Sequence, residues 1–189
     1  MAQVLMLAFP EEELNIPAPD GFFIRPCDPD WRVDAPGWIH ACEKLYDRVY
    51  TLDEFREEMI DDPECGPERI FFICRKSDGA VAGTATAKLG EVAILHNVGM
   101  AVEFMGMRLS RALCAAPVDY MFRHGAHRIQ LSSDDFRVPA LKTYLALGFR
   151  PWYKNEVFAE RWRAVFEANG LPKDAYFAYD EMESRKLPI

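Results

Sequence analysis

The sequence lacks a long apolar run, a paired-cysteine motif and a block of basic residues, and each absence excludes a class of protein. No apolar stretch approaches the length of a membrane-spanning helix, so we expect no membrane segment. The chain carries 22 Lys and Arg against 30 Asp and Glu, a formal net charge of -8. Nucleic-acid binding needs a cationic surface, which this composition does not supply.

Cysteines are few and unpaired in the sequence. The five are Cys27, Cys42, Cys65, Cys74 and Cys114. Their number is odd and no two form C-x-x-C, which disfavours both a disulfide framework and a zinc site. We therefore expect no metal and a reducing, cytoplasmic location. The apolar start of the chain has no basic residue and turns acidic at Glu11, which disfavours a signal peptide.

The apolar content, 50% of 189 residues, is enough for one hydrophobic core. We predict a single domain with an N-terminal arm at 1–21, a core at 22–153, and a C-terminal helix and tail at 154–189 packed on it. Periodicity and turn residues predict strands at 22–25, 70–74, 80–89, 92–100, 127–132 and 149–153. They predict helices at 36–48, from 51 to about 60, and at 106–124, 137–147 and 156–169. This order indicates an α/β protein with a mixed sheet.

The most informative stretch runs from 93 to 121, a strand that leads into a helix through a turn containing Gly106. The first N–H groups of such a helix have no partner within the helix and bind anions well. Arg108 and Arg111 lie near this helix start, where a cation is unfavourable by roughly 0.3–1 kcal/mol unless an anion is bound. The alternative is that both guanidiniums reach into solvent or pair with Glu103.

Two segments, LHNVGMAVEFMGMRLSRAL and DDFRVPALKTYLALGF, together resemble the GNAT superfamily of N-acetyltransferases. The resemblance covers about 22–153. It implies a twisted, mostly antiparallel sheet of six to seven strands flanked by helices, with a V-shaped opening between the strands at 92–100 and 127–132. Acetyl-CoA, as co-substrate, would lie in that opening.

The resemblance also implies which residues bind acetyl-CoA. The pantetheine would pair with the strand near Val98, Gly99 and Met100. The pyrophosphate would lie on the turn and the helix start, formed by Met105, Gly106, Met107, Arg108, Leu109, Ser110 and Arg111. Arg137 stands where the family often has Asn at the start of its second core helix.

The turn departs from the family pattern R/Q-x-x-G-x-G/A. Met105 stands in place of the leading Arg or Gln, Arg108 in place of the first Gly, and Ser110 in place of the second small residue. Glycine there allows a positive φ, so Arg108 has to tolerate the local backbone. Phosphate binding itself relies on backbone N–H groups, which any residue except proline supplies.

Acyl transfer to an amine needs a base, a donor to the thioester carbonyl and an acid for the leaving thiolate. By resemblance, Tyr144 is the acid and the backbone N–H of Gly99 or Met100 is the donor. His96, the one histidine on a core strand, is a candidate base, with Glu91 a weaker one. The alternatives are a structural tyrosine, a structural histidine and a solvated glutamate.

We therefore expect an acyl-CoA-dependent N-acyltransferase that moves an acetyl group to the primary amine of a small molecule or peptide. The altered turn favours the alternative of a non-catalytic GNAT-fold binding or regulatory protein. A homodimer through the C-terminal helix and tail is a further expectation.

Overall fold

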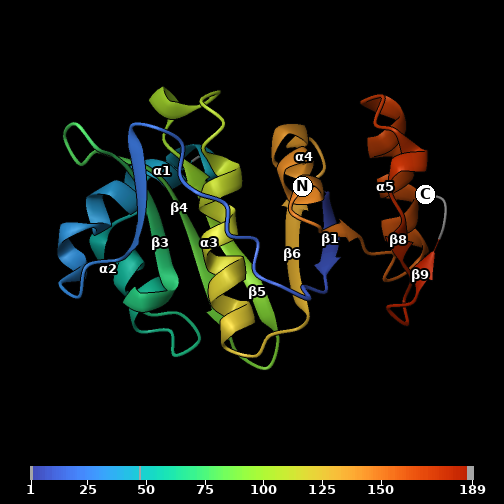
Figure 1. Ribbon diagram of the computed structural model, residues 1–189, viewed down its shortest axis with the longest axis horizontal. Coiled ribbons are helices and arrows are strands. Elements are labelled where there is room, and N and C mark those ends of the chain that lie inside the picture. Colours follow the sequence, from blue (N-terminus) through green and yellow to red (C-terminus); the bar gives the residue numbers. More distant parts are fainter. Residues whose placement is uncertain (1, 47, 187–189) are drawn as a thin grey trace. The chain divides into compact units, whose positions relative to one another are not determined.

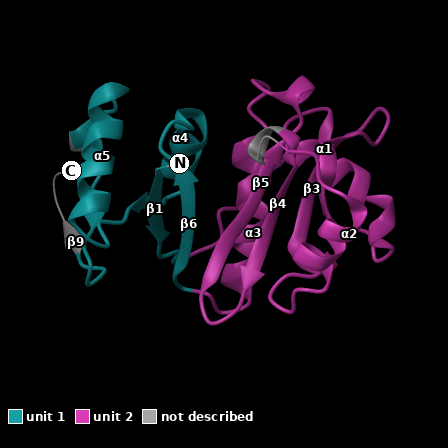
Figure 2. Ribbon diagram, turned by 180° about the vertical axis from the view of Figure 1, so that it is seen from behind, with its two compact units in different colours: residues 1–11, 127–189 teal, residues 12–126 magenta. Residues whose placement is uncertain are grey.

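The computed structural model describes residues 2–46 and 48–186, which form two compact units. Unit 2 is the continuous segment 12–126, and unit 1 combines residues 1–11 with 127–189 (Figure 2). The predicted division into arm, core and C-terminal segment remains a prediction.

Unit 2 is built on four antiparallel strands in the order β2 (Phe22–Pro26), β3 (Ile70–Arg75), β4 (Val81–Leu89) and β5 (Ala93–Met100). The predicted meander is confirmed. Residues 70–74 are all buried, as expected for a strand covered on both faces. Helices α1 (Ala35–Tyr46) and α2 (Leu52–Phe55) lie on one face of this sheet and α3 (Ser110–Arg123) on the other (Figure 1).

The helices on the first face begin where the sequence predicts. Thr51 and Glu54 form the expected capping box: the Thr51 hydroxyl accepts the Glu54 N–H, and the Glu54 carboxylate accepts the Thr51 N–H. The chain continues as a π-helical segment over Arg56–Ile60. Phe55 and Met59 are fully buried with Trp38 of α1, so this face is apolar beneath the helices.

The predicted start of the central helix at Gly106 is wrong. A 3-10 turn occupies Val102–Phe104, and α3 begins only at Ser110. The cause is local: Gly106 has φ 81° and Arg108 has φ 59°, and left-handed residues cannot continue a right-handed helix. The segment between is a loop anchored at its two ends by buried Phe104 and Leu109.

A β-bulge interrupts β5. Thr86 pairs with His96 and Thr84 with Gly99, so two residues of β5 face one residue of β4. The first extra residue, Asn97, has φ 44°. Asparagine tolerates this left-handed conformation better than most residues, and here it takes the place of the glycine that such bulges favour.

In unit 1, β1 (Gln3–Ala8) is the middle strand, between β6 (Ile129–Asp134) and β7 (Arg150–Pro151), and both pairings are antiparallel. The sequence reading assigned β1 to an irregular arm. The error arose because prolines and acidic residues follow the short apolar run, while the strand is stabilised by partners more than 120 residues away in the chain.

Helices α4 (Val138–Ala146) and α5 (Glu156–Ala168) and a hairpin of β8 (Ala178–Tyr179) and β9 (Arg185–Lys186) complete unit 1. Helix α5 packs on β1, where the Trp162 Nε1 donates to the Leu5 carbonyl at 2.9 Å. Arg161 donates to the Gln3 carbonyl at 3.0 Å. The Leu5 carbonyl also accepts the Trp152 N–H at 2.9 Å, so Trp162 adds a second bond to it, while Arg161 supplies a donor to the Gln3 carbonyl.

The fold class is as expected, α/β with flanking helices and seven strands that are antiparallel within each unit. The predicted opening lies between β5 and β6, which belong to different units, so it remains a prediction. Within residues 2–46 and 48–186, every helix is too short or too polar to cross a bilayer.

Candidate functional site

The start of α3 presents a row of free backbone donors. Within α3, Leu113 is the first residue whose N–H donates to a preceding carbonyl, that of Leu109 at 3.1 Å. The described residues offer no acceptor to the N–H groups of Ser110, Arg111 and Ala112, and Leu109 gives no side-chain cap. These donors and the positive end of a 14-residue helix suit a phosphate group.

The loop before α3 has the left-handed backbone that the glycines of the family pattern would allow. Arg108, which stands at the family's first glycine, has φ 59° and so adopts the left-handed conformation as a non-glycine residue. This conformation costs an L-residue about 1–2 kcal/mol. A strained residue beside a row of free donors is a feature that functional sites often show.

The loop is exposed between its two buried ends. Met105 and Met107 are about half exposed, at 51% and 49%, whereas Leu109 is buried. The two methionines are therefore not core residues and are available to a ligand. Arg108 and Arg111 are exposed and form no ion pair among the described residues, which agrees with the alternative that they reach into solvent, whereas Glu103 pairs with His40 instead.

The bulge turns a backbone amide of β5 away from β4. Ala101 donates to the Ala82 carbonyl at 3.0 Å. Because hydrogen-bonded positions alternate along an antiparallel pair, the N–H of Met100 points away from β4. Met100 thus offers the kind of donor that the resemblance assigns to the thioester carbonyl, while Gly99 faces β4.

The bulge also decides the face on which His96 lies. His96 and Gly99 pair with Thr86 and Thr84, which share one face of β4. A Cβ on Gly99 would lie 2.6 Å from the Ala41 carbonyl oxygen of α1, so this is the face covered by α1. Without the bulge, simple alternation would place His96 on the same face as Met100.

The environment of His96 favours its neutral form. Burial lowers the pKa of His96 below its usual value, and the positive charge of Lys88 lowers it further. Lys88 lies diagonally across the strand pair from His96 and donates to Asp62 at 2.7 Å. A neutral imidazole can accept a proton near neutral pH, as a general base must.

The remaining predicted residues lie elsewhere. Glu91 is exposed in the bend before β5. Tyr144 and Arg137 belong to unit 1: Tyr144 is buried on α4 with its ring edge-on to Phe149, and the Arg137 Nε donates to Asp134 at 2.8 Å. The described residues contain no group of three or more possible metal ligands.

The sequence reading missed two features of the site. Asn97 was not singled out, although asparagine is among the non-glycine residues that most often adopt left-handed backbone. His40 was given no functional role, but its Nε2 lies 3.0 Å from a carboxylate oxygen of Glu103, in the 3-10 turn that leads into the loop. No local pattern links these two residues, because 63 positions separate them.

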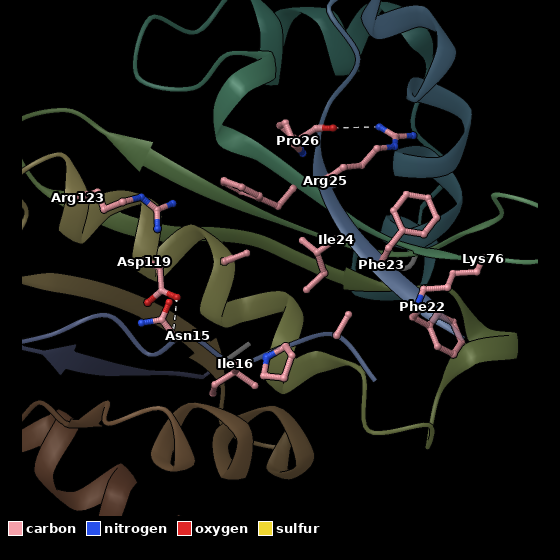
Figure 3. Close-up of a pocket in the computed structure, with 14 residues that line it drawn as sticks. Asn15, Ile16, Phe22, Phe23, Ile24, Arg25, Pro26, Lys76, Asp119 and Arg123 are labelled. Carbon is pink, nitrogen blue, oxygen red and sulfur yellow. Dashed lines mark hydrogen bonds between the residues drawn. The ribbon is translucent and has the colours of Figure 1, made fainter. Parts of the chain in front are cut away.

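A separate groove of about 570 Å³ lies in unit 2 between β2, α3 and the segment 15–18 (Figure 3). Asp119 holds this segment by accepting the N–H groups of Leu14 and Asn15 at 2.6 and 3.0 Å. Two of the three cations that line the groove are neutralised, Arg25 by Asp34 and Arg123 by Glu13; the third is Lys76. The groove contains none of the predicted site residues, so it does not define the site.

The architecture and the donor row together define an α/β protein with a candidate anion site at a strand–loop–helix junction. The model of the Acetyltransferase (GNAT) family matches residues 39–149, more than half of the chain. The chain therefore belongs to the GNAT acetyltransferase family.

A curated relative is a mycothiol acetyltransferase of Stackebrandtia nassauensis, which is 31% identical over 102 residues. The match covers 51% of this chain and 32% of the relative, so the chain spans only about a third of that protein's length.

Solved structures show the same fold at low identity. A GCN5-related N-acetyltransferase from Sphaerobacter thermophilus has a TM-score of 0.60 at 19% identity, covering 79% of this chain and 48% of that one. The NatC complex bound to Gag peptide and CoA has a chain with a TM-score of 0.58 at 14% identity, covering 67% of this chain and 82% of that one.

Proposed function

We propose that this chain is an acyl-CoA-dependent N-acyltransferase that transfers acetyl from acetyl-CoA directly to a primary amine. The observation that carries the proposal is the row of free N–H groups at Ser110, Arg111 and Ala112 beside left-handed Arg108. A pyrophosphate fits this donor set, and it would turn the unfavourable cations at the helix start into favourable ones. The family's general reaction and the CoA-bound NatC neighbour support acetyl-CoA as co-substrate.

In the proposed reaction, the amine nitrogen attacks the thioester carbonyl carbon, a C–N bond forms and the C–S bond breaks. The N–H of Met100 donates to the carbonyl oxygen as negative charge develops on it. His96 takes the proton that the amine loses. Tyr144, by resemblance to the family, gives a proton to the leaving thiolate.

Two buried hydroxyls support a water-mediated path to His96. Thr84 and Thr86 are fully buried on the face of His96, and their Oγ atoms have no partner among the described residues. Buried polar atoms of this kind are usually satisfied by ordered water. Water held by these hydroxyls would carry the amine proton to an imidazole that does not touch the amine.

The test compares acetyl-CoA binding to the wild-type protein and to Arg111→Glu, measured by calorimetry. A glutamate in the first helical turn is favourable for the helix, so the variant should fold at least as stably. Its charge should repel a pyrophosphate and weaken binding by about tenfold or more. Arg32→Glu, the same charge change at an exposed site, is the control and should bind normally. No heat from the wild-type protein at millimolar acetyl-CoA would defeat the proposal.

The role of Tyr144 has its own test. Tyr144→Phe should lower turnover with little change in CoA affinity, because the hydroxyl acts only on the leaving thiolate. Equal turnover in both proteins would remove Tyr144 from the mechanism.

The second candidate is a non-catalytic GNAT-fold binding or regulatory protein. Arginine at the left-handed position, in place of glycine, favours it. Acetyl-CoA binding without acetylation of any of a panel of primary amines would support this candidate. The acceptor class (small molecule or peptide), a cytoplasmic location and a homodimer remain predictions; the five cysteines, all buried and unpaired, agree with a reducing compartment.

A further inference from the structure

We infer that His40 is a positioning residue for the loop before α3, acting through Glu103. This role rests on the proposed function, because that loop is where the cofactor would bind. His40 lies on α1, while Glu103 lies in the 3-10 turn of Val102–Phe104 that opens the loop. The two oxygens of Glu103 are 3.0 and 3.1 Å from the His40 Nε2, so one side chain ties the loop to α1.

The loop has few other attachments. Phe104 is buried with its ring edge-on to Phe22, and the Arg75 guanidinium lies 5.1 Å from the Phe104 ring centre. From Met105 to Arg108 the side chains are exposed. The start of the loop is therefore attached by two contacts, the polar His40–Glu103 pair and the buried ring of Phe104.

Glu103 also places a negative charge near the proposed pyrophosphate site, and His40 can neutralise it. It is the single acidic residue between Glu91 and Asp119, and it lies in the segment that would receive a pyrophosphate. An uncompensated carboxylate there would oppose anion binding. Protonated His40 cancels that charge and holds the carboxylate toward α1.

The other charges around the pair favour the protonated imidazole. Glu43 of α1 lies 3.6 Å from the His40 Nδ1, so His40 sits between two carboxylates. Arg75 also acts on Glu103 but is engaged twice by Asp78. The pKa of His40 is accordingly raised, chiefly by its hydrogen bond to Glu103. The raised pKa extends the charged form of the pair to higher pH than an isolated imidazole would allow, and the pair weakens as His40 loses its proton in more alkaline solution.

The first experiment measures affinity for CoA at about pH 6 and about pH 9, on either side of the expected titration. The wild-type protein should bind CoA more weakly at the higher pH. His40→Ala should bind about threefold to tenfold more weakly at the lower pH and lose the pH dependence. Adding Glu103→Gln to His40→Ala should restore part of the affinity, because the repelling carboxylate is gone while the tie to α1 stays lost. His124→Gln, a change to an exposed histidine bonded to its own helix, is the control.

The second experiment follows amide hydrogen exchange of residues 101–109 in the protein without ligand. His40→Ala should exchange faster there than the wild type, and His40→Gln, which keeps a hydrogen-bond donor, should fall between them. Faster exchange confined to this segment would support the positioning role even if CoA did not bind, an outcome that would count against the proposed function alone. Unchanged exchange in His40→Ala would overturn the inference, as would unchanged CoA affinity at both pH values.

Discussion

The bulge of β5 and the loop before α3 each combine a left-handed non-glycine residue with a nearby histidine. In the bulge these residues are largely buried, and at the loop they are exposed. Each has one non-glycine residue with left-handed backbone, Asn97 in the bulge and Arg108 in the loop. Each also has one histidine nearby: His96 directly precedes Asn97, and His40 contacts Glu103 in the turn that leads into the loop. His96 beside the bulge is largely buried and has a lowered pKa, whereas His40 at the loop is half exposed and has a raised one.

The comparison shows two ways to hold an unusual backbone. In the bulge, Asn97 is buried and its Nδ2 lies 3.0 Å from the Met59 sulfur, so packing fixes the conformation. In the loop, Arg108 has no such contact and its conformation follows from the anchors on either side. We expect the bulge to be a fixed part of the fold and the loop to be the part that a ligand completes.

The largest expected effect distinguishes the two candidate bases. His96→Gln should lower turnover by about a hundredfold, because proton transfer by a positioned side chain contributes that much or more. Glu91→Gln should have little effect, since Glu91 is exposed in a bend. Steady-state rates with a primary amine would decide, and a larger loss in Glu91→Gln would reverse the assignment.

The next effect concerns the stability of the bulge. Asn97→Ala should lower the free energy of unfolding by about 1–2 kcal/mol, because alanine tolerates left-handed backbone poorly and the side-chain contact is lost. Asn97→Gly should cost less, since glycine adopts this backbone readily. Urea denaturation measures both, and a glycine variant less stable than the alanine variant would show that backbone conformation is not the limiting factor.

The two histidines should give stability opposite dependences on pH. The lowered pKa of His96 means that the unfolded chain takes up the proton first, so stability falls as pH drops below about 6.5. The raised pKa of His40 means that its contribution is complete below about pH 6.5 and is lost as pH rises through the folded-state pKa.

Unfolding curves across pH for His96→Gln and His40→Gln would separate these contributions. The first variant should lose less stability in acid than the wild type, and the second should lose less in mild alkali. Identical pH profiles for both variants and the wild type would contradict the assigned environments.

The smallest expected effect is the change in stability when Arg108 of the loop is replaced. Arg108→Gly should change stability by only about 0.5 kcal/mol, in the stabilising direction, because relief of the left-handed strain is largely offset by the greater freedom of glycine in the unfolded chain. Arg111→Gly, in the first turn of α3, should be destabilising by about 0.5–1 kcal/mol. Thermal melts of both variants test this, and a loss of stability in Arg108→Gly would show that the guanidinium stabilises the loop.

Patterns within short segments predicted much of the fold and part of the site. The apolar run at 70–74 and the capping box at Thr51 act over a few residues, so the sequence displays them directly. Reliance on patterns within short segments also explains why the start of α3 was predicted wrongly. The late start of α3 depends on two left-handed residues, and an arginine gives no sign that it will adopt that conformation.

Other parts of the site depend on residues distant in the chain. The face of His96 is set by a bulge whose register is defined against β4, and the partner of Glu103 lies 63 positions away on α1. Strand β1 was assigned to an arm because its neighbours in space come from the end of the chain.

The sequence by itself determined the order of the main strands and helices after residue 21, the strand–turn–helix junction and the family resemblance, because hydrophobic periodicity and turn chemistry are properties of neighbouring residues. Only the tertiary structure decided that Arg108 has left-handed backbone, that the first amides of α3 are free, and that His40 rather than an arginine holds Glu103. Those features arise where the chain packs against itself, and no stretch of sequence contains both sides of such a contact.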